Sequence, residues 1–164
     1  MMYNNFFVLA RHLGELCISK DVHIALAESC TGGRVSSLIT DVAGSSSWFN
    51  GGAVVYTNAA KSALLDVDPE LIDQYGAVSE SVAKAMAQGA LRKLQADFAL
   101  SITGIAGPNG GSVEKPVGQV CFALADHKGV DAKTMFFSGG RESIRKSAAL
   151  FAFEWMILHC ANMN

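Results

Sequence analysis

Val22-His23-Ile24-Ala25-Leu26-Ala27-Glu28-Ser29-Cys30-Thr31-Gly32-Gly33 is the stretch of sequence that decides the fold. Residues 22–27 are mostly apolar and predict a buried strand, and Gly32-Gly33 followed by residues 34–39 predicts the opening of a helix. Free backbone N–H groups at a helix start favour an anion or an oxyanion. The stretch therefore predicts a strand–turn–helix unit that exposes Ser29 at the turn.

Hydrophobic periodicity and capping residues predict the elements on either side. The spacing of apolar residues predicts an amphipathic helix over 4–20. A strand over 52–56 is followed by Asn58, a good N-cap for a helix that ends at Leu65, and this places Lys61 in the first turn of that helix. The later elements are a helix from Pro69, a Ser79-capped helix over 80–95, strands over 98–103, 117–125 and 130–137, and a last helix over 142–159.

Helices alternate with strands over the first two thirds of the chain, and a hairpin follows. This order predicts an α/β fold, a three-layer α/β/α domain with a mixed, mostly parallel five-stranded sheet in which one strand is reversed. The chain has 164 residues, half of them apolar and 17% charged, so we expect a single domain over residues 1–164.

Charge and hydropathy exclude several classes of partner. The net charge is −2, and no run of Lys and Arg provides a footprint for nucleic acid or an anionic membrane. Residues 1–7 carry no basic segment typical of a signal peptide, and no apolar run reaches the roughly 18 residues of a membrane span. We therefore expect a cytoplasmic protein with neither nucleic acid nor membrane as a partner.

The four cysteines predict neither a metal site nor a redox pair. They are widely spaced, with no C-x-x-C motif and no histidine at ligand spacing: Cys17, Cys30, Cys121 and Cys160. We interpret three of them as structural thiols and leave the role of Cys30 open because it follows Ser29.

Three loops rich in glycine or polar residues follow predicted strands, at residues 28–33, 57–61 and 103–112. In sheets of this kind ligands gather at the carboxyl ends of the strands, so we expect the loops to share one cleft. The glycines that begin with Gly104 allow backbone to approach a ligand closely.

A serine nucleophile needs a base, and the histidines are poorly placed to provide one. They fall in terminal helices, in a hairpin turn or at the far end of the first strand: His12, His159, His127 and His23. Lys61 is the better candidate, because a desolvated amine in the first turn of a helix can lose its proton near neutral pH. Tyr56, at the end of the preceding strand, is placed to relay a proton or to orient Lys61.

Structural interpretations of the same three residues stay open. Ser29 can be an N-cap, Lys61 a solvated helix lysine and Tyr56 a core aromatic residue.

Six ordered blocks of sequence together resemble the CinA C-terminal domain family over nearly the whole chain. The blocks are Ala27–Gly33, Gly44-Ser45-Ser46, Gly51 to Lys61, Gly76-Ala77-Val78-Ser79-Glu80, Thr103–Pro108 and Glu114–Gly118. The resemblance implies an amidohydrolase that converts nicotinamide mononucleotide to nicotinate mononucleotide and ammonia, in the recycling of pyridine nucleotides. It implies Ser29 as the nucleophile, Lys61 as the base, and no metal or organic cofactor.

Further residues are expected to contact the phosphorylated substrate that the resemblance implies. We expect backbone N–H groups of Cys30, Thr31, Gly32 and Gly33 to form the oxyanion hole. We expect further contacts to the substrate from Ser45, Ser46, Thr103, Gly104 and Arg141. Gly140 stands where the family usually carries an aspartate.

Two other functions compete with a serine amidase. One is a non-catalytic nucleotide-binding module linked to competence or damage response, which does not need a neutral Lys61. The other is a cysteine amidase that uses Cys30. In addition, large apolar residues lie on several sides of the last helix and favour a homodimer: Phe151, Phe153, Trp155 and Met156.

Overall fold

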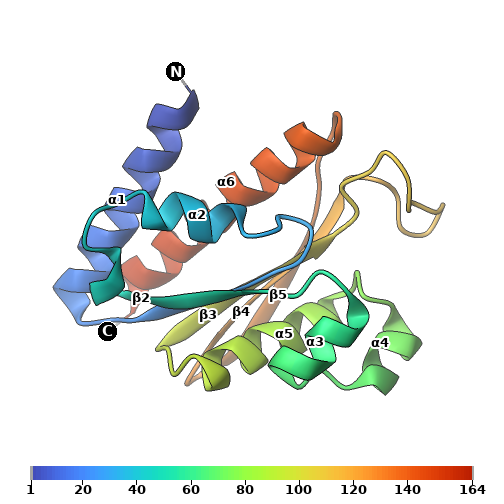
Figure 1. Cartoon of the computed structure of the whole chain (residues 1–164), viewed down its shortest axis with the longest axis horizontal. Coiled ribbons are helices and arrows are strands. Elements are labelled where there is room, and N and C mark those ends of the chain that lie inside the picture. The colour runs from blue at the N-terminus through green and yellow to red at the C-terminus, as the bar shows by residue number, and fades with distance from the viewer. Residues whose placement is uncertain (1, 164) are drawn as a thin grey trace.

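A computed structural model of the chain describes residues 2–163 as one five-stranded sheet covered by helices on both faces (Figure 1). The strands are β1 (Ile24–Glu28), β2 (Phe49–Val54), β3 (Phe98–Gly104), β4 (Gln119–Asp126) and β5 (Gly129–Phe136). The helices are α1 (Met2–Lys20), α2 (Arg34–Thr40), α3 (Asn58–Leu65), α4 (Pro69–Tyr75), α5 (Glu80–Lys93) and α6 (Arg141–Asn162), with a short 3₁₀ helix η1 (Ser45–Ser47).

The order of strands in the sheet is β2-β1-β3-β4-β5. Strand β1 pairs in parallel with β2 and β3, and β4 pairs antiparallel with both β3 and β5, so β4 is the one reversed strand. The turn between β4 and β5 is held by the Asp126 carboxylate, which accepts the N–H groups of Lys128 and Gly129. The mixed, mostly parallel sheet predicted from the sequence is confirmed.

The two layers of helices differ in the size of the side chains beneath them. Helices α1, α2 and α6 cover one face, and α3, α4 and α5 cover the other (Figure 1). Ile24 and Leu26 of β1 point into a core rich in aromatic residues on the first face, whereas Ala25 and Ala27 point into the second. The alternation follows from the two-residue period of a strand, and the small residues let α5 lie close to the sheet.

Strand boundaries differ from those predicted at the edge of the sheet. Strand β2 begins at Phe49, which pairs with Ile24, and ends before Tyr56. A Cβ at Gly52 would clash with the Ser36 side chain, so this glycine serves the close packing of α2 on β2 rather than a turn. The N-cap of α3 is Thr57 and not Asn58, since the Thr57 hydroxyl accepts the N–H of Ala60 at 3.1 Å.

The long helices α1 and α6 pack against each other through the aromatic-rich core. Phe153 and Met156 are fully buried and Trp155 is 8% exposed, whereas Phe151 is only partly buried. Most of the side chains that favoured a homodimer are therefore covered within the chain, and the homodimer stays a prediction. Among residues 2–163, no helix combines the length and the apolar character needed to cross a bilayer.

Candidate active site

The three loops that follow β1, β2 and β3 meet at one pocket of about 260 Å³, as the sequence predicted. Ser29 follows β1, Tyr56 and Lys61 follow β2, and Thr103 ends β3. Arg141, the first residue of α6, also lines the pocket.

The side chains of Ser29 and Lys61 are in hydrogen-bonding contact inside this pocket. The Lys61 Nζ atom lies 3.1 Å from the Ser29 Oγ atom and 3.0 Å from the backbone oxygen of Val55. Lys61 is only 1% exposed and Ser29 only 7%. Lys61 is thus not a solvated helix lysine, and since the N-cap of α2 is Gly33, Ser29 is not the cap of that helix either.

Burial lowers the pKa of Lys61 from its ordinary value near 10.5, because the charged ammonium loses its hydration. None of the ion pairs formed within residues 2–163 includes Lys61. The amine therefore has no carboxylate that would hold its proton. This combination favours a neutral amine that can accept the proton of the Ser29 hydroxyl.

Glu28, beside Ser29, was not assigned a role from the sequence. Its carboxylate is fully buried and accepts four hydrogen bonds, from the N–H groups of Gly33, Val35 and Ser36 and from the Ser36 hydroxyl. These are the N–H groups that the first turn of a helix leaves without intrahelical partners. Glu28 therefore ties the end of β1 to the start of α2 and fixes the loop that carries Ser29.

Fewer backbone N–H groups are available as oxyanion donors than the sequence predicted. The N–H of Gly33 is occupied by Glu28, and the N–H of Gly32 donates to the backbone oxygen of Ser29 at 3.0 Å. The expectation that Gly32 and Gly33 supply oxyanion donors is therefore wrong. Within the described residues, the N–H groups of Cys30 and Thr31 make no backbone hydrogen bond.

Arg145 of α6, which the sequence reasoning missed, holds this loop from behind. Its Nε donates to the backbone oxygen of Cys30 at 3.0 Å and its Nη2 to that of Thr31 at 2.8 Å. Because N–H and C=O point in opposite directions across a trans peptide, these bonds turn the Thr31 N–H away from Arg145. The signal was available in the sequence, since Arg141 and Arg145 lie one helical turn apart on the same face of α6.

Tyr56 and Arg141 form a second polar pair at the mouth of the pocket. The Arg141 guanidinium donates to the Tyr56 hydroxyl at 2.7 Å and to the backbone oxygen of Gly107 at 2.9 Å. Tyr56 is 55% exposed, so it is not a core aromatic residue. Its observed partner is Arg141, and the backbone oxygen of Val55 orients Lys61 instead.

The structure does not bring Ser45 and Ser46 to the pocket. Helix η1 lies just before β2, whose first residue pairs with Ile24 at the start of β1, whereas Ser29 follows the end of β1. Five residues of strand, roughly 16 Å, separate these two edges of the sheet. Ser45 and Ser46 therefore cannot contact a substrate held at Ser29 within the same chain.

Other expected contacts line the pocket, but their polar groups are partly occupied. Thr103 and Gly104 both lie on its wall. The Thr103 hydroxyl donates to the backbone oxygen of Ala77 at 2.9 Å, so it fastens the loop before α5 and keeps only its lone pairs for a ligand.

Cys30 is a poor alternative nucleophile. Its side chain is 5% exposed, and burial raises the pKa of the thiol to about 12. A thiol with that pKa holds almost no thiolate at neutral pH. Within residues 2–163, no three metal-binding side chains come together to hold an ion.

Comparisons with known proteins point to one family. The family model described as "CinA C-terminal domain" matches residues 7–160. A protein of Escherichia coli strain K12 named "Nicotinamide-nucleotide amidohydrolase PncC" is 47% identical over 147 residues, which cover 89% of each chain.

Longer proteins and solved structures match as well. A "CinA-like protein" of Geobacter sulfurreducens is 52% identical over 144 residues, which make up 88% of this chain but 35% of that protein. The crystal structure of the competence/damage inducible protein CihA from Agrobacterium tumefaciens superposes with a TM-score of 0.90 at 41% identity, over 93% of this chain and 94% of the other.

Proposed function

Because the chain belongs to the CinA C-terminal domain family, we propose that it hydrolyses the carboxamide of nicotinamide mononucleotide to nicotinate mononucleotide and ammonia. We place this activity in the cytoplasm, in the recycling of pyridine nucleotides. The observation that carries the proposal is the 3.1 Å contact between Lys61 Nζ and Ser29 Oγ in a buried pocket. A neutral lysine in contact with a serine hydroxyl can activate it for attack on an amide carbon.

The geometry around Lys61 fits the first half of such a reaction. A neutral amine has two N–H bonds and one lone pair, and the backbone oxygen of Val55 takes one of those N–H bonds. The lone pair is then directed to the Ser29 hydroxyl and takes its proton as Oγ attacks the carboxamide carbon. The N–H groups of Cys30 and Thr31 face no competing backbone acceptor and receive the developing oxyanion.

The second half of the reaction reverses the roles of the same groups. Lys61, now protonated, gives its proton to the departing nitrogen, and ammonia leaves behind an ester between Ser29 and the nicotinoyl group. A water molecule then attacks the ester carbon while Lys61 takes its proton, and the returned proton restores the Ser29 hydroxyl. The cycle needs one water and leaves the protein unchanged.

Arg141 is the proposed contact for the substrate phosphate. Its guanidinium is held by Gly107 and Tyr56 at the mouth of the pocket, and a planar guanidinium suits a phosphate. Asn58 and Asn109 line the same pocket and offer amide groups to the ribose hydroxyls.

The test is the release of ammonia from nicotinamide mononucleotide between pH 6 and 9, with free nicotinamide as the control. We expect release from the nucleotide, and much less from nicotinamide because it lacks the phosphate that Arg141 binds. No release from either compound, with nucleotide binding intact, would favour the non-catalytic binding module. Loss of activity in Cys30→Ala together with full activity in Ser29→Ala would favour a cysteine amidase.

A further inference from the structure

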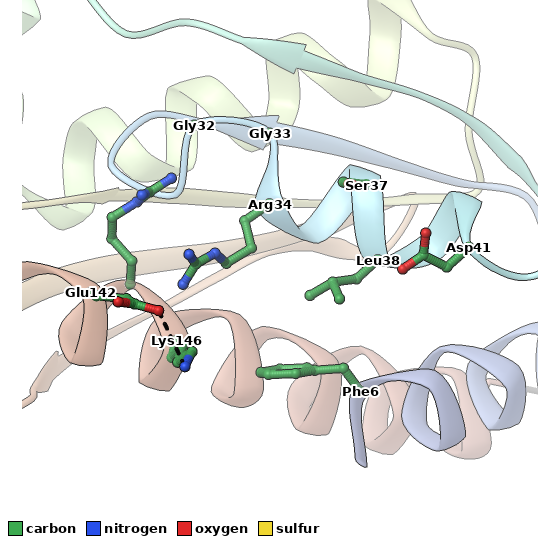
Figure 2. A pocket seen from close by; sticks show the side chains of 10 residues that line it. Phe6, Gly32, Gly33, Arg34, Ser37, Leu38, Asp41, Glu142 and Lys146 are labelled. Carbon is green, nitrogen blue, oxygen red and sulfur yellow. Dashed lines mark ion pairs between the residues drawn. The ribbon is translucent and has the colours of Figure 1, made fainter. Parts of the chain in front are cut away.

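A second cavity lies on the other side of the loop that carries Ser29. It has a volume of about 330 Å³ and opens between α2 and α6, with Phe6 of α1 at one end (Figure 2). It shares no lining residue with the active-site pocket, although Gly32 and Gly33 of the Ser29 loop form part of its wall. We refer to it as the α2–α6 cavity.

The charged residues of the α2–α6 cavity are three basic and two acidic. They are Arg34, Arg145, Lys146, Asp41 and Glu142. Lys146 pairs with Glu142 at 3.2 Å, and Arg145 is occupied by the backbone oxygens of the Ser29 loop. Arg34 and Asp41 take part in neither of these contacts, so Arg34 is the basic residue of the cavity that is left to bind an anion.

Arg34 lines this cavity and has an unused donor. Its Nη1 atom is buried and has no hydrogen-bond partner among the described residues. The Arg34 side chain extends from the start of α2 toward α6, where Glu142 and Lys146 lie (Figure 2). A buried guanidinium nitrogen without an acceptor is unfavourable, and an anion that supplies the acceptor would remove that cost.

Apolar side chains lie next to the cationic end. Leu38 of α2 and Phe6 of α1 line the part of the cavity beyond Arg34, away from Glu142 (Figure 2). A ligand that fits both ends therefore combines an anionic group with an apolar body. A dianion suits the site better than a monoanion, because it offers oxygens to both Arg34 and Lys146.

We propose that the α2–α6 cavity binds a small phosphate monoester that carries an apolar ring, with its phosphate on Arg34 and Lys146 and its ring against Leu38 and Phe6. Such a ligand contacts Gly32 and Gly33 directly, so it touches the Ser29 loop from the side opposite the active site. The site is separate from the proposed substrate pocket and does not depend on its chemistry.

Phenyl phosphate is a suitable probe because it has both features and no nucleoside. We would titrate it into Ser29→Ala protein saturated with nicotinamide mononucleotide and follow the backbone amide signals by NMR. We expect saturable shifts at Gly32, Gly33 and Ser37. Gly104 and Gly107 report on the substrate pocket separately, so the result does not depend on whether the nucleotide is a substrate.

Variants test the assignment of the phosphate. Arg34→Met keeps the apolar stem and should weaken binding about tenfold or more, and Lys146→Gln about threefold. Arg92→Met, an exposed position on α5 at the other face of the sheet, should leave the affinity unchanged. An unchanged amide spectrum outside the cavity shows that each variant is folded.

Three results would overturn the proposal. Shifts confined to Gly104 and Gly107 would place the probe in the substrate pocket. An affinity for phenyl phosphate that is unchanged in Arg34→Met would show that Arg34 does not bind the phosphate. Binding of phenol or benzoate as tight as that of phenyl phosphate would show that the cavity does not select a phosphate monoester.

Discussion

Glu28 and Lys61 are both buried ionisable residues beside Ser29, yet their surroundings differ. The Glu28 carboxylate accepts four hydrogen bonds from the first turn of α2. The Lys61 amine contacts two oxygens, neither of which belongs to a carboxylate. A buried charge is tolerated where hydrogen bonds replace its hydration, and is disfavoured where they do not.

The comparison separates a structural charge from a reactive group. Glu28 fixes the geometry of the Ser29 loop through its hydrogen bonds to the start of α2. Lys61 is held in a place that favours its neutral form, which is the form a general base requires. The two residues should therefore respond in opposite ways when they are replaced, one through stability and the other through turnover.

The largest expected effect is the loss of turnover in Lys61→Met. Methionine fills a similar volume but has no group that accepts the Ser29 proton, so we expect kcat to fall about 10³-fold or more. Ser29→Ala should cost as much, and the double variant little more, because the two residues act as a unit. Ammonia release measures kcat, and calorimetry checks that both variants still bind the nucleotide.

Lys128→Met is the matched control, since Lys128 lies exposed in the β4–β5 turn. Its activity should equal that of the wild type. An active Lys61→Met protein would contradict the assignment of Lys61 as the base.

The next effect is the loss of stability in Glu28→Gln. The amide replaces one carboxylate oxygen with an NH₂ group that faces backbone N–H groups of α2, and we expect the free energy of unfolding to fall by about 2–4 kcal/mol. Urea unfolding of the wild type and the variant measures this difference in the free energy of unfolding. Glu142→Gln is the control, because the Glu142 side chain is 73% exposed and its pair with Lys146 should contribute less than about 1 kcal/mol. Equal losses in the two variants would show that Glu28 does not cap α2.

A smaller effect should appear in the pH dependence of stability. The pKa of Lys61 is lowered in the folded protein, so the unfolded chain binds more protons at pH values between the folded pKa and the ordinary value near 10.5. Over that range the stability of the wild type should rise with pH relative to Lys61→Met, by at most about 1.4 kcal/mol per pH unit. Urea titrations from pH 6 to 9 measure the difference. A difference that falls with pH would mean that the fold stabilises the charged amine.

Local patterns were sufficient to predict the architecture. Apolar runs and caps predicted the strands and helices: α4 begins at Pro69 and Ser79 caps α5, as the sequence indicated. The start of β2 was missed because Gly51 carries no hydrophobic signal, and its place in the strand is set by pairing with Ala25 of β1. The boundaries of such a strand are set by its tertiary contacts and not by the intrinsic propensity of its residues.

The candidate site was predictable only in part, for the same reason. The meeting of three loops follows from parallel strands, which brought Ser29 and Lys61 together as expected. Helical spacing places Arg145 on the same face of α6 as Arg141, but the backbone atoms that Glu28 and Arg145 contact lie 5 and 115 positions away, and no local pattern predicts those partners. Ser45 and Ser46 were wrongly assigned to the substrate site, because the sequence of a serine-rich loop does not show at which end of the strands the loop lies.

The smallest expected effect is that of Tyr56→Phe, and it tests whether Tyr56 acts on the Ser29–Lys61 pair. The Tyr56 hydroxyl contacts Arg141 at 2.7 Å, and the ring is 55% exposed, so water can replace the lost bond. We expect KM for the nucleotide to rise by no more than about threefold and kcat to stay unchanged, because Val55 and not Tyr56 orients the amine. A fall in kcat of about 10²-fold would instead assign proton transfer to Tyr56, since that is the size of a general-acid or general-base contribution. The pair of steady-state constants therefore distinguishes a residue that positions Arg141 from one that belongs with Lys61.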